Sequence, residues 1–155
     1  MASDSRVRRA SAGDAAQAAR LMHRFNVEFD EEIDDVEVLE RRYREQLDDD
    51  DFAVILVAEN DVGFAQLRHK GQIYSDAPTA YLEELYVIPD RRGEGLGRAL
   101  LEAAMEEARA HGADHIDLGT SEDDTAARAL YESAGFTNRE GRPDGPVMLY
   151  YERDL

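Results

Sequence analysis

The chain has 155 residues, a length that suits one domain spanning residues 1–155 with a hydrophobic core of its own. Its 35 acidic and 18 basic residues give a net charge of −17. Such a field repels polyanions, so we expect no nucleic-acid partner and no binding to an anionic membrane. The absence of cysteine excludes disulfide bonds, thiolate metal sites and a cysteine nucleophile.

Neither a membrane span nor a targeting segment is expected. The longest apolar run, Phe52–Ala58, has the length of a strand and is too short to cross a bilayer. Met1–Ala10 lacks the apolar stretch of a signal peptide, so we expect a cytoplasmic protein. Lys70 is the single lysine among the basic residues. This acidic, arginine-rich bias leaves two explanations open, a high-salt cytoplasm and a GC-rich genome.

The N-terminal third predicts one short strand and two helices. Val7–Ala10 has the pattern of a strand, and Ser11 with Asp14 three residues later forms an S-x-x-D signal that begins a helix. Val36–Leu47 carries apolar residues at helical spacing and predicts a second helix.

A hairpin and a third strand are expected next. Two β-rich runs, Phe52–Glu59 and Val62–His69, are separated by the turn pair Asn60 and Asp61. The loop and the strand that follow are Gly71–Thr79 and Ala80–Ile88.

The C-terminal half predicts two more helices and further strands. One helix runs to about His111, with Gly112 as its stop signal. The other expected elements are a strand at His115–Gly119, a helix opened by Ser121 and Asp124 that runs to about Ser133, and two strands after this helix, the last of them in Pro146–Leu155. This order predicts an α+β fold with a mixed, mostly antiparallel sheet of six to seven strands and helices on both faces.

The stretch RRGEGLG, Arg91–Gly97, lies between a strand and a helix. Backbone N–H groups at the start of a helix bind phosphate, and its three alternating glycines let an oxygen approach closely. A tight turn without a ligand is the structural alternative. A nucleotide P-loop fails because no lysine or hydroxyl residue follows Gly97, and a dinucleotide fingerprint with Asp117 as its ribose acid has the wrong glycine spacing.

The segment Tyr81–Phe136 resembles the acetyl-CoA-binding half of the GNAT N-acetyltransferase superfamily. The family signature [RQ]-x-x-G-x-[GA] is matched by Arg92, Gly95 and Gly97. Two flanking blocks add to the resemblance, L-Y-V-x-P before the loop and A-x-x-L-Y-x-x-x-G-F at Ala127–Phe136.

The resemblance implies where acetyl-CoA binds. In this family two central strands splay apart, and the pantetheine arm lies between them like an extra strand. The strand residues implied are Leu85, Tyr86 and Val87, with backbone hydrogen bonds at Leu85 and Val87, although both side chains also suit a plain core. The loop residues implied for the pyrophosphate are Arg92, Gly93, Glu94, Gly95, Leu96, Gly97 and Arg98.

The resemblance also implies the catalytic groups. Tyr131 matches the family tyrosine that protonates the departing thiolate or steadies its sulfur, although it would also suit a core position. Glu83 is expected as the base that acts through water and Glu84 as the anchor of the amine, because YLEELYV resembles the YLED strand of spermidine/spermine N-acetyltransferases. Exposed edge carboxylates are the alternative. Neighbours on a strand point to opposite faces, so only one faces the site unless a bulge intervenes.

Two positions depart from the family pattern. Asp124 stands where many relatives have asparagine; an ionised carboxylate accepts hydrogen bonds only, so helix capping is an alternative to a pantetheine contact. Glu94 places a carboxylate in the phosphate loop, where it weakens cofactor binding unless it points to solvent.

We expect no metal site. His111 and His115 have H-x-x-x-H spacing, but they straddle a predicted helix end and no third ligand is evident. Asp48–Asp51 lack the glycine and the spacing of a calcium loop.

The expected function is an acetyl-CoA-dependent N-acetyltransferase in which the amine attacks directly. The acidic field favours a small cationic acceptor such as a polyamine, an aminoglycoside or an amino-acid amine, bound near Phe25–Leu47 and Gly71–Thr79. Two alternatives stay open, a catalytically silent acyl-CoA-binding sensor or partner module and a protein N-terminal or lysine acetyltransferase. A homodimer is also left open.

Overall fold

A computed structural model describes residues 4–155, which form two compact units. The first unit ends at Leu118, and the second comprises Gly119–Leu155. Met1–Ser3, part of the stretch in which no signal peptide is expected, lie outside the described residues. Within residues 4–155, every helix is too short or too polar to cross a membrane.

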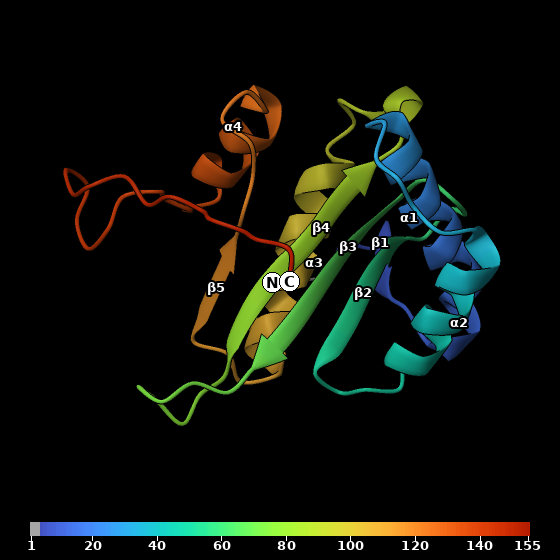
Figure 1. The fold of residues 1–155 in the computed structure, drawn as a ribbon, viewed down its shortest axis with the longest axis horizontal. Coiled ribbons are helices and arrows are strands. Elements are labelled where there is room, and N and C mark those ends of the chain that lie inside the picture. The colour runs from blue at the N-terminus through green and yellow to red at the C-terminus, as the bar shows by residue number, and fades with distance from the viewer. Residues whose placement is uncertain (1–3) are drawn as a thin grey trace. The chain divides into compact units, whose positions relative to one another are not determined.

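The first unit is built on one mixed sheet of five strands (Figure 1). The strands follow chain order, β1 to β4 are antiparallel, and β5 joins β4 in parallel. The strands are β1 Val7–Arg9, β2 Phe52–Val57, β3 Gly63–Lys70, β4 Thr79–Val87 and β5 His115–Leu118. The helices are α1 Ala15–Glu28, α2 Val36–Gln46 and α3 Leu96–Ala110, with short 3-10 turns at Ala12–Asp14 and Pro89–Arg91.

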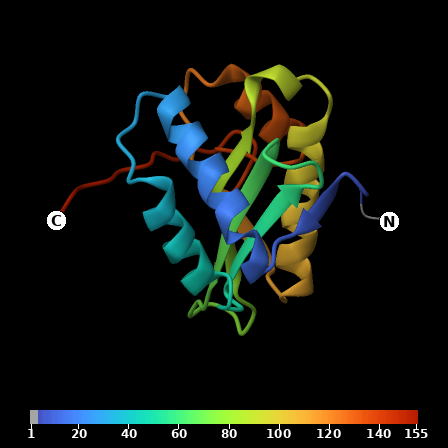
Figure 2. The same cartoon turned by 90° about the vertical axis from the view of Figure 1, so that its right-hand side faces the viewer.

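Helices cover both faces of this sheet, with α1 and α2 on one face and α3 on the other (Figure 2). Strand β2 is buried along its whole length because successive side chains enter opposite layers. Phe52, Val54 and Leu56 belong to the core beneath α1 and α2, together with Phe64 of β3. The predicted α+β class, the mostly antiparallel order and the two-sided helix cover are confirmed.

Local signals act as expected in this unit. The Ser11 N–H donates to the carboxylate of Asp14 at 2.8 Å, as the capping signal predicts. Asp61 has a φ of 59° in the turn between β2 and β3, a conformation that aspartate tolerates better than most residues.

The second unit contains one helix, α4 Thr125–Ser133. Its N-cap is Asp124, whose side chain accepts a hydrogen bond from the Ala127 N–H at 3.1 Å, so the helix begins later than Ser121. The two strands expected after this helix are wrong. Within the second unit the segment makes only an isolated bridge between Arg139 and Val147.

The sheet therefore has five strands among the described residues, not six to seven. The tail run Val147–Tyr151 has β-forming residues, but propensity yields a strand only where a neighbouring strand supplies cross-strand partners. The Gly- and Pro-rich stretch at residues 141–146 leads into this run, and its side chains are exposed.

Candidate active site

Strand β4 carries a bulge at its two glutamates. Glu84 lies opposite Gln66 of β3, whereas the next pair in the register is Leu82 opposite Leu67, so Glu83 is an extra residue with no partner. An extra residue interrupts the alternation of side chains. Both glutamates therefore face the α1 and α2 layer. A bulge is the condition under which both were expected to face the same side.

Glu83 is held by a hydrogen-bonded network. Its Oε2 accepts from Gln66 Nε2 at 2.6 Å, and its Oε1 accepts from Arg68 Nε at 2.5 Å. Gln66 in turn accepts from the Tyr43 hydroxyl at 2.6 Å, which ties the network to α2. Both carboxylate oxygens of Glu83 thus have donors, and its side chain is only 21% exposed.

Glu84 differs from its neighbour. Among residues 4–155 its carboxylate has no hydrogen bond or ion pair, and burial together with the charge of Glu83 raises its pKa to about 7. Burial and the charges of Glu84 and Glu83 also hold the pKa of Tyr43 well above its usual value. The two carboxylates and this phenol therefore share one poorly solvated region.

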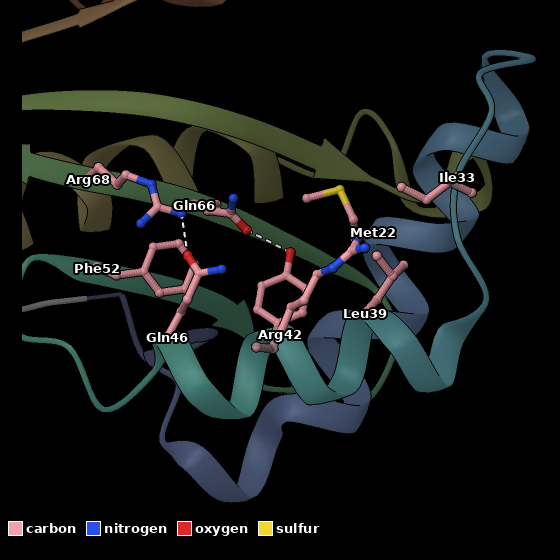
Figure 3. Close-up of a pocket in the computed structure, with 9 residues that line it drawn as sticks. Met22, Ile33, Leu39, Arg42, Gln46, Phe52, Gln66 and Arg68 are labelled. Atoms are coloured by element: carbon pink, nitrogen blue, oxygen red, sulfur yellow. Dashed lines mark hydrogen bonds between the residues drawn. The ribbon is translucent and has the colours of Figure 1, made fainter.

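A pocket of about 190 Å³ lies beside this network (Figure 3). Side chains from α1, α2, β2, β3 and the loop after α1 surround it. They are Met22, Ile33, Leu39, Arg42, Tyr43, Gln46, Phe52, Gln66 and Arg68. Five of these residues lie within Phe25–Leu47, four of them on α2 and one on the loop before it. None comes from Gly71–Thr79, the other segment expected near the acceptor.

The arginines of the pocket are oriented by neighbours. The Arg68 guanidinium stacks over the Phe52 ring at 4.5 Å and donates through Nη2 to Gln46. Arg42 donates through Nη2 to Asp34 at 2.6 Å.

The far half of β4 has an open edge. Pairing with β5 ends at Leu82 opposite Leu118, whereas β4 continues to Val87. The Ile88 N–H points to β3 and donates to the Val62 carbonyl at 2.9 Å. Because backbone groups alternate along a strand, those of Val87 and Leu85 point to the other, open edge. This edge coincides with the splay that was expected for the pantetheine arm.

The glycine loop turns directly into α3. Gly93 and Gly95 have φ values of 81° and 80°, which favour glycine. The first hydrogen bond of the helix runs from the Ala99 N–H to the Gly95 carbonyl at 3.0 Å, so the N–H groups of Leu96 and Gly97 precede it at the positive end of the helix. An anion is the ligand that such a helix start favours.

The side chains of the loop are turned away from the glycines. Glu94 accepts from Arg91 Nε at 2.8 Å, and Arg91 also pairs with Glu59 at 2.7 Å. The carboxylate of Glu94 is therefore paired with an arginine that it shares with Glu59. The Glu94 carbonyl is fixed separately by Arg6 Nη1 at 3.0 Å.

Arg92 connects the loop to α1. It donates through Nη2 to Glu28 at 2.7 Å and through Nε to the Val87 carbonyl at 2.9 Å. Glu28 also accepts from the Tyr86 hydroxyl at 2.9 Å. Burial raises the pKa of Tyr86 to about 12, and its side chain is part of the core. Its backbone lies opposite Phe64 of β3, so Tyr86 is not open to a cofactor.

The other predicted residues lie in the second unit. Tyr131 lies on α4, and its ring packs against Phe136 with centroids 5.9 Å apart. Asp124 caps the same helix, which is the alternative that the sequence allowed for this position.

Histidines form a separate cluster. The rings of His69 and His111 stack with centroids 3.9 Å apart, and His111 Nε2 lies 3.0 Å from Asp51. Over the described part of the chain, no group of three or more His, Asp or Glu side chains is arranged to hold a metal ion.

Sequence reasoning missed Tyr43, Gln66, Arg68 and Glu28. One signal was available, because Gln66 is a polar residue inside the otherwise apolar start of a strand, and such a residue needs a hydrogen-bond partner when it is buried.

Comparison with known proteins finds one family match and several similar acetyltransferases. The model of the acetyltransferase (GNAT) family matches residues 18–136. The protein named uncharacterized N-acetyltransferase YhfO, from Bacillus subtilis (strain 168), is 31% identical over 137 residues, which cover 87% of this chain and 91% of that one. Aminoglycoside N(6')-acetyltransferase type 1 from Stenotrophomonas maltophilia is 30% identical over 146 residues, which cover 90% and 91% of the two chains. The solved structure of a candidate acetyltransferase from Arthrobacter sp. FB24 is 39% identical, with a TM-score of 0.90 and coverage of 100% and 99%.

Proposed function

The chain belongs to the acetyltransferase (GNAT) family, and from this premise we propose that it transfers the acetyl group of acetyl-CoA to a primary amine of a small molecule. The observation that carries the proposal is the β4 bulge, which brings two carboxylates to one face beside a small pocket. The Stenotrophomonas relative is named for an aminoglycoside acceptor, which supports a small-molecule amine over a protein. A cytoplasmic location is part of the proposal.

Three features of the first unit suit acetyl-CoA. The open edge of β4 offers the backbone groups of Leu85 and the N–H group of Val87 to an extended, amide-bearing arm, whereas the Val87 carbonyl accepts from Arg92. The glycine loop and the start of α3 offer N–H groups to a pyrophosphate. The pairing of Glu94 with Arg91 reduces the repulsion that its charge would otherwise cause.

The reaction begins with deprotonation of the bound ammonium. A lysine-like amine has a pKa of about 10.4, so it binds protonated and needs a base before it can attack. Glu84 is the base in this proposal, because its carboxylate has no competing donor among residues 4–155 and its pKa lies near neutrality. Glu83, expected as the base from sequence, is instead a positioning residue, since Gln66 and Arg68 occupy both of its oxygens.

Acetyl transfer follows by direct attack. The amine lone pair forms an N–C bond to the thioester carbonyl carbon, the C–S bond breaks, and its electron pair leaves on sulfur. Tyr131 is proposed to protonate this thiolate. The proton that the attacking nitrogen loses as the amide forms replaces the one that Tyr131 gives up. The first proton passes from Glu84 to solvent, so one ammonium and one thioester give one amide, one thiol and one proton.

The test is acetyl-CoA-dependent release of thiol with polyamines, aminoglycosides, amino acids and short peptides as acceptors, at low and at molar KCl. Because the chain has no cysteine, a thiol reagent detects only the CoA product. Release with a class of small amines is the expected result. Acetyl-CoA binding without release for any acceptor would refute the transferase and favour a silent acyl-CoA-binding module.

A further inference from the structure

The lining of the pocket beside β4 has basic but no acidic side chains, in contrast to the chain as a whole, and each arginine is paired with a carboxylate outside the lining, Arg68 with Glu83 and Arg42 with Asp34. The nine lining residues include two arginines, Arg42 and Arg68, and no acidic residue, although the chain carries 35 acidic residues and a net charge of −17. An acceptor group that binds here would have to approach the guanidinium N–H groups that these two pairs leave unused.

Both guanidinium groups retain unused donors. Arg68 spends Nε on Glu83 and Nη2 on Gln46, and Arg42 spends Nη2 on Asp34. Within the described residues, Nη1 of Arg68 and both Nε and Nη1 of Arg42 have no partner. Guanidinium N–H groups match the oxygens of a carboxylate in geometry and charge.

The remaining walls and the size of the pocket restrict the body of the acceptor. Met22, Ile33, Leu39 and Phe52 give it an apolar surface. Its volume of about 190 Å³ lies below the roughly 300–1,000 Å³ of sites that enclose drug-sized ligands. A short apolar side chain fits this space, whereas a multi-ring polycation would extend beyond it.

We infer that the acceptor is a small amino acid-like amine, with an apolar body in this pocket and a carboxylate bound by Arg42 and Arg68. This inference rests on the proposed function and narrows it. The amine would lie toward Glu84, on the β4 side of the network, and the carboxylate toward α2. A zwitterion then meets one charge of opposite sign at each end, which a polyamine or an aminoglycoside does not.

Three acceptors that share one carbon skeleton test the inference. Leucine carries the carboxylate, leucinamide has a neutral amide in its place, and 3-methylbutylamine lacks the group. We expect kcat/KM for leucine to exceed that for the other two by ~10-fold or more, as a charge-assisted contact allows. Replacing a carboxylate by an amide lowers the basicity of the neighbouring amine, so a preference for leucine over leucinamide cannot come from easier deprotonation.

A pair of neighbouring arginines supplies the matched variants. Arg42→Gln should raise KM for leucine by ~10-fold or more and affect KM for 3-methylbutylamine much less, so the ratio of the two kcat/KM values should fall. Arg41→Gln, on the same helix but outside the pocket lining, should leave both unchanged. Faster turnover of leucinamide, 3-methylbutylamine or spermidine than of leucine overturns the inference and leaves the transferase intact. Silence with every acceptor overturns the proposed function and the inference with it.

Discussion

Replacing Glu84 by glutamine tests the assignment of the base. The amide cannot accept the ammonium proton, and a positioned general base contributes roughly 10²- to 10⁴-fold, so kcat/KM should fall by about that factor. The wild-type profile should also follow the ionisation of Glu84. With a pKa of about 7, about a tenth of the enzyme is active at pH 6 and about nine tenths at pH 8.

The assay is thiol release at subsaturating amine from pH 5.5 to 9. Glu84→Gln should abolish the acid limb near pH 7. Glu83→Gln should keep a limb but move it to lower pH, because the negative charge of Glu83 helps to raise the pKa of Glu84. Glu45→Gln, an exposed carboxylate on α2, is the matched control and should leave the profile unchanged. An unchanged limb in Glu84→Gln would refute the assignment.

Three further changes test other parts of the site and the fold. Tyr131→Phe should lower kcat by about tenfold or more while calorimetry shows unaltered acetyl-CoA affinity; unchanged turnover would remove Tyr131 from the mechanism. Gly95→Ala places a side chain at φ 80°, which costs roughly 1–2 kcal/mol, so calorimetry should show weaker acetyl-CoA binding, whereas Gly71→Ala, with open space around it, should bind normally. Burial, followed by the charge of His111, lowers the pKa of His69 below its ordinary 6.5, so the unfolded state gains a proton first on acidification. The urea concentration at the unfolding midpoint should therefore decrease as the pH is lowered from 7 to 5.5, and it should decrease less in His69→Gln. An equal decrease in both proteins would contradict this reasoning.

Much of the first unit could be predicted from sequence because its elements are defined by local patterns. The capping pair Ser11 and Asp14, the turn at Asp61 and the stop at Gly112 each act within a few residues of where they stand. The strands predicted after α4 are wrong because local patterns are not enough to define a strand. A strand exists only through its neighbour, and the sequence of Pro146–Leu155 does not say whether a neighbour is available.

The glycine loop and the pocket also differ in how far local sequence defines them. The proposed phosphate loop is contiguous, so its glycines and the helix start after them are enough to predict it. The pocket instead collects Tyr43, Gln66 and Arg68 from different elements, and only the register of β3 against β4 brings the latter two to Glu83. Periodicity predicts which face a residue occupies but not which residue lies opposite it.

The bulge explains why the two glutamates differ in chemistry although they are neighbours in sequence. Without it, Glu83 and Glu84 would point into opposite layers and would not influence each other strongly. With both on one face, two carboxylates in a poorly solvated region repel, and one must be neutralised for both to persist. Arg68 and Gln66 stabilise the charge of Glu83, whereas burial and then the charge of Glu83 raise the pKa of Glu84 toward neutrality. One added residue in a strand thus yields an anchored anion and a carboxylate able to exchange a proton at physiological pH.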